Sequence, residues 1–519
     1  MRRRDLLKSA AVLGAISGSA HADVPTHLWA GYDFGPAPKS PDRLNQGPFG
    51  VEQDDGWFTL SGTTASEQPV PNFGLGLVGY TWEESGPSLA AREGRETLEA
   101  HVEKMAGLPF VDVLYIRCDW RDVQKSPGRL DLHPVWKLTF DAARRHGKRV
   151  AFRVMASNTV GQPKYLAMPD YVQAKVPIVD IGVLPGEGPG HFREPRYDHP
   201  EFQKSFRDLT ELLAAEFDQN PLVEWIDVMQ YGFWGESHTG GLPSPFPDYA
   251  TAERTMMAMT RLQIESFKRA QLAVNSEPDI SNVGNREVID ACVRSGAWLR
   301  SDSIMVEEPE QIEILANRPP WLATVLEDGY FRQYDPAKPG YLPKDPAGLN
   351  MLEAYMLHVL DIGSNYWSLW TETANLEKYN QLYPRGFTRL RQRLGYRVRP
   401  SWVWQRKRYG ANELVVNFTN DGVAGAPGVL RLTLKAAGGG FIAGGCLDAG
   451  QPHGGRIRQA AFAVPRDLEG HSVFLSAQIE TKGGVRRDVR WACEQPLEAD
   501  GSYRITVKQQ SDPDWRKSV

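Results

Sequence analysis

The 519-residue sequence lacks several features that mark particular classes of protein. Downstream of its N-terminal segment it has no run of the roughly 18 apolar residues that a membrane-spanning helix needs. Neither sign of charge is in large excess, because 59 Lys and Arg stand against 64 Asp and Glu, a formal net charge of -5. We therefore expect neither nucleic acid nor an acidic membrane surface as a partner.

Metal-binding and nucleotide-binding patterns are also missing. The four cysteines do not have metal-ligand spacing, and no two histidines are placed to hold a metal ion. The first predicted strand is not followed by the G-x-G-x-x-G sequence of dinucleotide-binding folds. We expect no metal and no cofactor. Cys446 and Cys493 both lie in the C-terminal region and are the one pair considered for a disulfide.

The N-terminal segment reads MRRRDLLKSAAVLGAISGSAHA. Arg3 and Arg4 begin a stretch that resembles the twin-arginine export signature, and a weakly apolar run follows. Ala20-His21-Ala22 then supplies a cleavage pattern of small residues. We predict that residues 1–22 are a twin-arginine signal peptide and that the mature protein is periplasmic or secreted.

The rest of the chain shows a regular alternation of patterns. Residues 23–71 have no sustained period and are expected to form an irregular leader that packs against the main domain. From residue 72 on, stretches typical of buried strands alternate with stretches of helical period. The predicted strands are 73–82, 111–120, 148–158, one that begins at Val223, 271–277, 301–308, 321–331 and 365–372, and the predicted helices are 96–107, 133–147, 199–217, 248–270, 285–296, 309–318, 349–363 and 378–395.

Eight strand and helix pairs predict an α/β fold, a (β/α)8 or TIM barrel, over residues 72–398. Past this point the helical period stops. Short alternating strands separated by Gly, Asn, Asp and Pro follow, which predicts a small C-terminal β-sandwich over residues 399–519. A Pro- and Gly-rich insertion after the third strand, residues 162–198, is a candidate wall of a cleft.

Barrel active sites lie at the carboxyl ends of the strands, so the residues that end each predicted strand are the candidates for function. The fourth strand runs into Trp234, Glu236 and His238. A carboxylate flanked by aromatic rings suits chemistry on sugars, because rings stack on sugar faces and desolvate a carboxyl group. The other strand ends add Glu327 as an acidic residue and the following candidates for substrate binding: Arg117, Asp119, Trp120, Asn158, Glu307, Tyr330, Trp367 and Trp370.

Three stretches carry a resemblance to known enzymes. They are YIRCDWRDVQKSPGRLDL on the second strand, WGESH at the fourth, and the seventh-strand carboxylate together with an aromatic eighth strand. The chain resembles the clan A (β/α)8 glycoside hydrolases that include family 42 β-galactosidases and family 5 glycanases. More closely, it resembles bacterial barrel proteins with a C-terminal β-sandwich of unassigned function. The resemblance covers most of residues 72–510.

This resemblance implies roles for individual residues. In that clan an acid/base Glu ends strand four and a nucleophilic Glu ends strand seven, which correspond to Glu236 and Glu327. It implies an exported glycoside hydrolase that cleaves an oligo- or polysaccharide with two carboxylates, by a retaining mechanism. Arg117 would then keep Glu327 ionised, and Trp234 would keep Glu236 protonated.

Alternatives stay open at this point. Glu307 and Glu308 compete with Glu327 for the place of the second carboxylate. The clan usually has Asn immediately before the acid/base, where this chain has Gly235, so a catalytically inactive carbohydrate-binding barrel is a second reading. An envelope structural or interaction module is a third.

Single side chains also have structural alternatives. As an alternative to a catalytic role, Glu327 is a solvated loop carboxylate. As an alternative to substrate contact, Arg117 and Asp119 form a structural pair at the barrel rim. His238 is in one reading a loop hydrogen-bonding residue. Trp367 and Trp370 divide between core and sugar platform, because alternate residues of a barrel strand point inward and outward.

Overall fold

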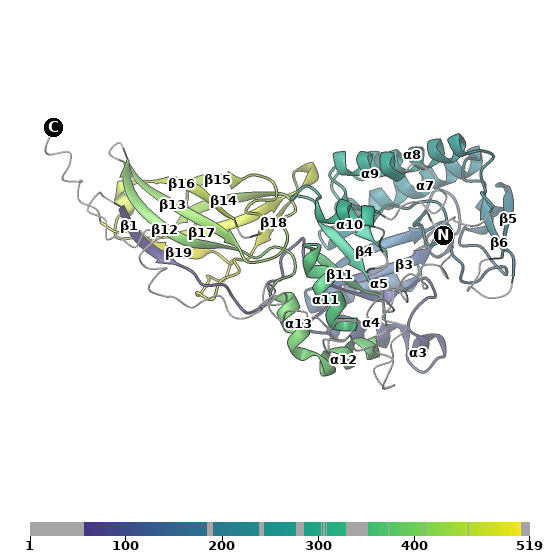
Figure 1. Ribbon diagram of the computed structural model, residues 1–519, viewed down its shortest axis with the longest axis horizontal. Helices are drawn as coiled ribbons and strands as arrows, with labels where there is room; N and C mark the ends of the chain where they lie inside the picture. Colours follow the sequence, from purple (N-terminus) through teal and green to yellow (C-terminus); the bar gives the residue numbers. More distant parts are fainter. Residues whose placement is uncertain are drawn as a thin grey trace, which may run out of the picture.

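A computed structural model describes residues 57–183, 190–237, 243–276, 285–302, 304, 307, 309–328, 351–371, 373–408, 411–454 and 456–509. Two bodies lie end to end along the molecule, a β/α barrel and an antiparallel β-domain (Figure 1). The predicted fold, a TIM barrel followed by a C-terminal β-sandwich, is confirmed. Residues 1–22, the predicted signal peptide, lie outside the described part of the chain.

Within the described residues, eight parallel strands close the barrel in chain order, and each pairs with its neighbours. They are β2 (Gly76–Trp82), β3 (Val113–Asp119), β4 (Arg149–Met155), β7 (Val223–Asp227), β8 (Leu272–Asn275), β9 (Trp298–Ser301), β10 (Thr324–Glu327) and β11 (Tyr366–Leu369). Helices surround them, namely α4 (Leu98–Gly107), α5 (Pro134–His146), α7 (Pro200–Phe217), α8 (Tyr249–Ser266), α9 (Asn285–Arg294), α10 (Pro309–Ala316), α11 (Met351–Asp361), α12 (Thr373–Leu382) and α13 (Pro384–Arg391).

Local sequence explains where these helices begin and end, as α5 illustrates. The first N–H groups of a helix have no acceptor within the helix. In α5, Pro134 in the first turn has no N–H, and the Val135 N–H donates to the His133 side chain. The helix ends at Gly147, whose φ of 62° is the left-handed conformation that glycine adopts without steric cost.

One predicted barrel strand is wrong. The sixth strand was expected over 301–308, whereas β9 covers Trp298–Ser301. Only four residues pair, and Arg300 stands among them, so the strand shows no apolar run that a sequence pattern could reveal. Glu307 therefore lies six residues beyond the last strand residue, Ser301, and not at the strand end. Glu308 lies outside the described residues.

Alternate strand residues pack on opposite sides of the barrel wall. Leu114, Ile116 and Cys118 of β3 face the helices and belong to the core between strands and helices. Tyr115 of β3 belongs instead to the apolar cluster inside the barrel, with Trp225 of β7 at a ring distance of 6.3 Å. This period of two decides which side chains reach the barrel mouth.

Two antiparallel sheets form the C-terminal domain. One has the order β1-β12-β13-β16 and the other β15-β14-β17-β18, with β19 paired to β17. The strands are β1 (Trp57–Gly62), β12 (Val398–Arg408), β13 (Ala411–Asn420), β14 (Val429–Ala436), β15 (Phe441–Leu447), β16 (Ile457–Val464), β17 (Ser472–Glu480), β18 (Arg486–Val489) and β19 (Tyr503–Thr506).

Two sequence-based expectations for this part of the chain are wrong. The segment 23–71 was expected to be irregular throughout, but β1 pairs antiparallel with β12 and so adds an edge strand to the C-terminal domain. Cys446 and Cys493 were considered as a disulfide, but both are free thiols. Cys446 is exposed and Cys493 is buried.

The sandwich covers the amino ends of the barrel strands. Arg487 of β18 donates hydrogen bonds to the carbonyl oxygens of Pro221 (2.9 Å) and Val223 (3.2 Å), at the start of β7. Its guanidinium also lies over the Phe73 ring, 5.0 Å from the centroid. Strand β18 accordingly lies beside the barrel in Figure 1. The carboxyl ends of the strands therefore lie on the side away from the sandwich.

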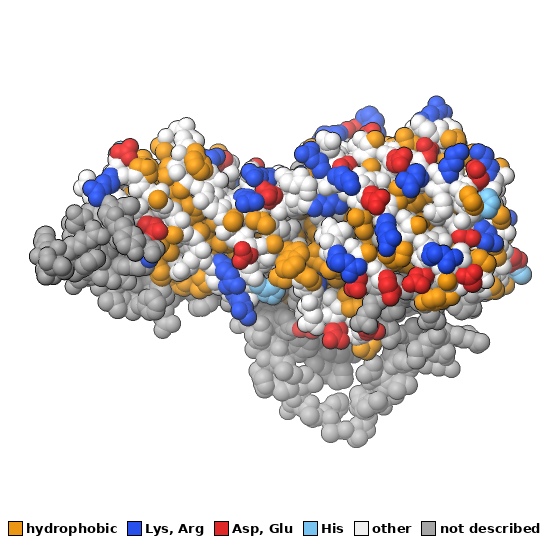
Figure 2. Space-filling model, turned by 90° about the horizontal axis from the view of Figure 1, so that it is seen from above, with side chains coloured by type: hydrophobic (Ala, Val, Ile, Leu, Met, Phe, Trp, Pro, Cys, Tyr) orange, Lys and Arg blue, Asp and Glu red, His pale blue; other side chains and the backbone are white. Residues whose placement is uncertain are grey.

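The outer surface has mixed charge. On the face in Figure 2, Lys and Arg side chains are interspersed with Asp and Glu over the barrel half. Among the described residues, no helix combines the length and the apolar composition that crossing a membrane requires.

Candidate active site

The site is built from inward-pointing side chains near the carboxyl ends of the barrel strands. Arg117 of β3, Arg153 of β4 and Arg300 of β9 all point into the barrel, and each is at most 3% exposed. Arg117 and Arg153 are direct partners in the parallel pairing of β3 with β4. Three buried cations at one level of a barrel demand carboxylate partners, because an unpaired charge in such a place costs several kcal/mol.

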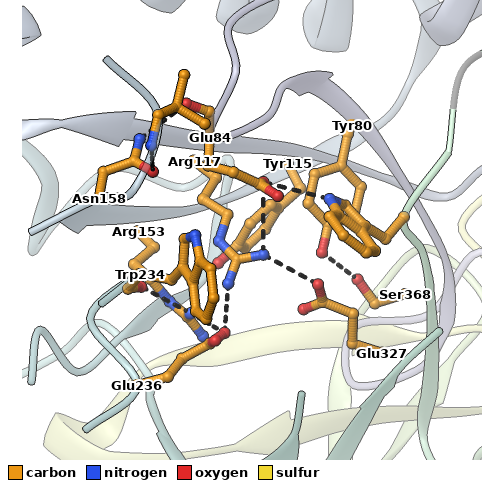
Figure 3. A network of polar contacts seen from close by, with 12 residues as sticks. Tyr80, Glu84, Tyr115, Arg117, Arg153, Asn158, Trp234, Glu236, Glu327 and Ser368 are labelled. Atoms are coloured by element: carbon orange, nitrogen blue, oxygen red, sulfur yellow. Dashed lines mark hydrogen bonds and ion pairs between the residues drawn. The ribbon is translucent and has the colours of Figure 1, made fainter. Parts of the chain in front are cut away.

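Arg117 connects the two acidic residues singled out in the sequence. One terminal nitrogen of its guanidinium donates to Glu327 (3.0 Å), and the other donates to Glu236. The first nitrogen also lies 3.7 Å from a carboxylate oxygen of Glu84. Figure 3 shows the guanidinium between the two carboxylates. A single planar group thus sets the separation of Glu236 and Glu327 across the mouth.

Each of the two carboxylates has a second arginine partner. Arg153 contacts Glu236 and also donates to the carbonyl oxygen of Trp234 (3.1 Å). Arg300 contacts Glu327. One level deeper, the Asp227 carboxylate accepts from Arg153 (2.9 Å) and from the Trp225 indole N–H (2.8 Å). Tyr115 also hydrogen-bonds to Asp227, and Arg300 forms an ion pair with the same carboxylate. Asp227 therefore holds both Arg153 and Arg300 from deeper in the barrel.

These contacts determine the charge states in the site. Burial lowers the pKa of Arg117, but the charges of Glu236 and Glu84 outweigh it and raise that pKa above its usual value. Burial raises the pKa of Tyr80 and of Tyr115, so both phenols stay neutral. Two guanidinium groups favour the ionised form of Glu236. The expectation that aromatic rings keep Glu236 protonated therefore does not match its surroundings.

Glu236 lies on a compact turn and not on the strand itself. Strand β7 ends at Asp227, and the chain then folds back so that the Ser237 N–H donates to the Tyr231 carbonyl oxygen (2.9 Å). Trp234 and Ser237 have φ of 58° and 65°, which non-glycine residues seldom adopt. Gly235, which stands where the clan that the sequence resembles has Asn, has φ of 71°. A left-handed backbone at this position explains why glycine is suited to it.

A rim of polar groups lies above the arginines. Asn158 donates from its amide nitrogen to Asp119 (2.9 Å) and to the Glu84 carbonyl oxygen (2.8 Å). The Trp370 indole N–H donates to the Glu84 carboxylate (3.2 Å). Burial raises the pKa of Asp119 to about 8, against the lowering effect of the Asn158 hydrogen bond. Asp119 thus keeps its proton at neutral pH, in contrast to the ion-paired Glu236.

The structure decides between several sequence-based alternatives. Glu327 is 2% exposed at the end of β10 and is not a solvated loop carboxylate. Arg117 pairs with Glu236 and Glu327, which excludes the alternative in which Arg117 and Asp119 form a structural pair. Trp370 is half-buried at the rim, in line with the sugar-platform alternative.

Two predicted substrate contacts are wrong. Trp120 is fully buried among Phe202 and Phe206 of α7. Trp367 stacks on Phe387 of α13 at 6.2 Å. Both side chains point outward, toward the helices. This follows from the alternation of side chains along a strand, because Arg117 and Ser368 point inward. Glu307 hydrogen-bonds to Ser301 (3.3 Å) and to His358 of α11 (3.2 Å), and its contact with substrate stays a prediction.

His238 and Tyr330, also predicted to bind substrate, lie outside the described residues. Sequence reasoning missed Arg153, Arg300, Asp227 and Glu84. The side chains of the first three point into the barrel. Because every second residue of a strand points inward, the inward positions Trp225 and Ala151 would have predicted that Asp227 and Arg153 also point inward. Arg300 was missed because its strand was misplaced. Among the described residues, no cluster of three or more His, Cys, Asp and Glu side chains is arranged to hold a metal ion.

No protein-family model matches the chain, and no curated protein matches its sequence. Similar solved structures include the catalytic domain of a β-amylase from Paenibacillus polymyxa, with 10% identity over 60% of this chain and 98% of that one, and a TM-score of 0.39. A trimodular GH5_4 subfamily endoglucanase has 12% identity over 82% and 78%, with a TM-score of 0.38. Endo-glycoceramidase II from Rhodococcus sp. has 13% identity over 75% and 97%, with a TM-score of 0.36.

The closed barrel of eight parallel strands itself confirms the fold that the sequence resemblance implied. Identities of 10–13% and TM-scores of 0.36–0.39 carry no argument about substrate or reaction. The chemistry of the site has to be argued from its own residues.

Proposed function

We propose that this protein is a glycoside hydrolase that cleaves an oligo- or polysaccharide at the barrel mouth with Glu236 and Glu327. The observation that carries the proposal is the Arg117 bridge, which holds both carboxylates at one guanidinium. Hydrolysis of a glycosidic bond needs two carboxyl groups on opposite sides of the sugar, within about 5 to 10 Å of each other. A shared guanidinium is compatible with that range.

Glu327 is the proposed nucleophile. Arg117 and Arg300 both contact its carboxylate, and they favour the ionised form that an attack on the anomeric carbon requires. Retention of configuration follows if the Glu327 oxygen forms the covalent glycosyl intermediate, which water then hydrolyses. Trp234 and Trp370 are half-buried near this position and are the proposed stacking surfaces for the sugar.

Glu236 is the proposed acid/base, and its charge state sets a condition on the mechanism. The carboxylate contacts both Arg117 and Arg153, so it has to exchange at least one of these contacts for a proton before it protonates a leaving group. In the proposal, entry of a sugar between Glu236 and Arg117 breaks one of these contacts, and the carboxylate then takes its proton from solvent water. Catalytic hydrogen bonds are often rearranged in the absence of substrate.

A second candidate function follows from the same contacts. If Glu236 stays ionised in the complex, the barrel binds carbohydrate without cleaving it. The paired arginines, together with Gly235 in place of the clan's Asn, favour this alternative. It requires the same mouth and the same aromatic side chains but no proton transfer.

Aryl glycosides that differ in their leaving group distinguish the two candidates. In a hydrolase, Glu236→Gln should lower kcat/KM about 10²- to 10⁴-fold for substrates with a poor leaving group and much less for dinitrophenyl glycosides, whose departure needs no acid. Glu327→Gln should abolish turnover of both kinds. Calorimetric binding of oligosaccharides with no product from any glycoside would establish the binding protein instead. Unchanged activity in both variants would refute the proposed pair.

We further propose that the protein is exported by the twin-arginine route and acts in the periplasm or outside the cell. Arg3, Arg4 and the Ala20-His21-Ala22 pattern support this. A fusion of residues 1–22 to a reporter should be exported, and replacement of both arginines by lysine should retain the reporter in the cytoplasm. Export that is unaffected by this replacement would contradict the assigned route.

A further inference from the structure

A buried carboxyl group outside the arginine cluster lies in the insertion between β4 and α7. The insertion contains a two-stranded antiparallel sheet, β5 (Ile178–Gly182) with β6 (Phe192–Pro195). Glu194 of β6 is 1% exposed. Its two carboxylate oxygens accept hydrogen bonds from the hydroxyl groups of Ser157 and Tyr197, one each. Such a group calls for an explanation, because burying a carboxyl costs free energy unless its partners compensate.

Both hydroxyl-bearing residues also bind the turn that carries Glu236. The Tyr197 hydroxyl accepts a hydrogen bond from the Gly232 N–H (2.9 Å). The Ser157 carbonyl oxygen accepts one from the Trp234 N–H (3.0 Å). Glu194 is therefore connected to the turn at two points, on either side of Phe233.

Apolar contacts support the same connection. Phe192 of β6 packs edge-on against Phe233 of the turn, with ring centroids 5.8 Å apart. Ile181 of β5 joins them in a small buried cluster, and Trp234 packs against it. The hairpin of the insertion thus rests directly on the turn.

The turn needs such support. Gly232, Trp234, Gly235 and Ser237 all have positive φ, and for a non-glycine residue that conformation costs about 1 to 2 kcal/mol. Two of the four are not glycine. Strained backbone of this kind persists only where surrounding contacts hold it.

We propose that Glu194 is a positioning residue for Glu236, acting through Ser157 and Tyr197 on the turn between Gly232 and Trp234. This inference rests on the proposed function and deepens it, because it assigns to the insertion the task of orienting the acid/base. Glu194 itself contacts neither Glu236 nor any of the three arginines through a hydrogen bond described in the structure.

The hydrogen-bond network is complete only with Glu194 ionised. The Gly232 N–H donates to Tyr197, whose hydroxyl donates to Glu194, and the Ser157 hydroxyl donates to the other oxygen. A protonated carboxyl has one acceptor fewer, so one hydroxyl would lose its acceptor. Burial raises the pKa of Glu194 to about 7, while the Ser157 and Tyr197 hydroxyls lower it, and Tyr197 is the titratable side chain in contact with it. The support for the turn should therefore weaken as pH falls through about 7.

The test measures the surroundings of Trp234 directly. In protein labelled with 5-fluorotryptophan, Trp234→Phe assigns the Trp234 resonance by its disappearance. The wild-type resonance should shift with a midpoint near pH 7, and Glu194→Gln should abolish that shift. Tyr197→Phe should reduce the shift and move its midpoint to higher pH, because the link through Ser157 remains and a hydrogen bond that lowers the pKa of Glu194 is lost. Tyr171→Phe is the matched control, because it removes the hydroxyl of a half-buried tyrosine of the insertion that bonds to Gln124 and not to the turn. A Glu194→Gln protein that titrates as the wild type does would overturn the inference.

Kinetics supply the second measurement. Glu194→Gln should lower kcat about 10- to 100-fold with little change in KM, because a misplaced acid/base affects the chemical step more than substrate binding. Tyr197→Phe keeps the ring and should behave alike, so the question is still decided if Glu194→Gln fails to fold. If a glycoside is cleaved and both variants keep wild-type kcat, the inference is wrong and the proposed function stands. If no glycoside is cleaved, the proposed function fails, and the Trp234 resonance still tests the link between Glu194 and the turn.

Discussion

At the scale of the residue, the site depends on buried charges that compensate one another. Arg117 contacts Glu236 and Glu327, while Arg153 and Arg300 each add a contact to one of these carboxylates. Removal of one partner leaves the remaining buried charges only partly compensated, which is far more destabilising than the absence of the whole set.

Arg117→Met should therefore lower the free energy of unfolding by about 3 to 5 kcal/mol. Glu236→Gln in the same chain should restore part of this loss, because it removes one of the carboxylates that the substitution leaves uncompensated. Urea denaturation of the two single variants and the double variant gives the coupling energy. Effects that add within about 0.5 kcal/mol would show that the two residues do not interact.

Asp119 makes stability depend on pH. Its folded-state pKa of about 8 lies above the unfolded value of about 3.9, so the folded state binds the proton more tightly. Its contribution to stability is then largest at low pH and is lost as pH rises towards 8. Asp119→Asn should become more stable relative to wild type between pH 5 and pH 8, by at most about 1.4 kcal/mol per pH unit.

Thermal unfolding of both proteins across that pH range measures this difference. Asp170→Asn is the control, because the Asp170 side chain is 90% exposed. A constant difference in melting temperature between Asp119→Asn and wild type at every pH would contradict the account.

At the scale of the element, the turn after β7 is the least ordinary part of the barrel. Gly235 has φ of 71°, and a Cβ added there would meet only ordinary contacts, the nearest being the Arg153 Cδ at 3.6 Å. Space is available, so the cost of a side chain is that of the left-handed backbone. Asn tolerates this conformation better than Ala does.

Gly235→Ala should therefore destabilise the protein by about 1 to 2 kcal/mol, and Gly235→Asn by less. Gly107→Ala at the end of α4 is the matched control, since nothing lies within 4 Å of an added Cβ there and φ is not positive. That variant should be neutral or slightly stabilised. Chemical denaturation measures all three, and equal losses for Ala and Asn at position 235 would argue against the backbone explanation.

The elements also show how far the sequence alone could lead. The alternation of strand and helix patterns predicted the barrel, because β3, β4 and the inner faces of the helices, which pack on the strands, have clear apolar periods. Strand β9 escaped detection since four residues with a central Arg300 carry no pattern. Glu236 was predicted as a site residue from the residues next to it in the sequence. Its contact with Arg153, and the link from Glu194 to the turn that carries Glu236, depend on packing between segments distant in the chain.

At the scale of the whole molecule, the sandwich covers the amino ends of the barrel strands. The apolar cluster inside the barrel continues into the sandwich, with Tyr115 and Trp225 in the same set as Phe418 and Trp491. A continuous core predicts that both bodies unfold together. Calorimetry should show one transition, with equal calorimetric and van't Hoff enthalpies.

Arg487→Ala should lower the temperature of that single transition, since it removes two hydrogen bonds to the start of β7 and the contact with Phe73. Two separate transitions in the wild type, with only one of them moved by Arg487→Ala, would show that the barrel and the sandwich are independent domains.

The central claim is that Glu327 and Glu236 form a hydrolytic pair across Arg117. Once a cleaved glycoside is known, its 2-deoxy-2-fluoro analogue with a good leaving group should trap the covalent intermediate, because the fluorine slows both steps and the leaving group favours the first. Peptide mass spectrometry should then find the sugar on Glu327 in the wild type and nowhere in Glu327→Gln. A sugar attached to another carboxylate, or turnover of the analogue without any label, would contradict the account.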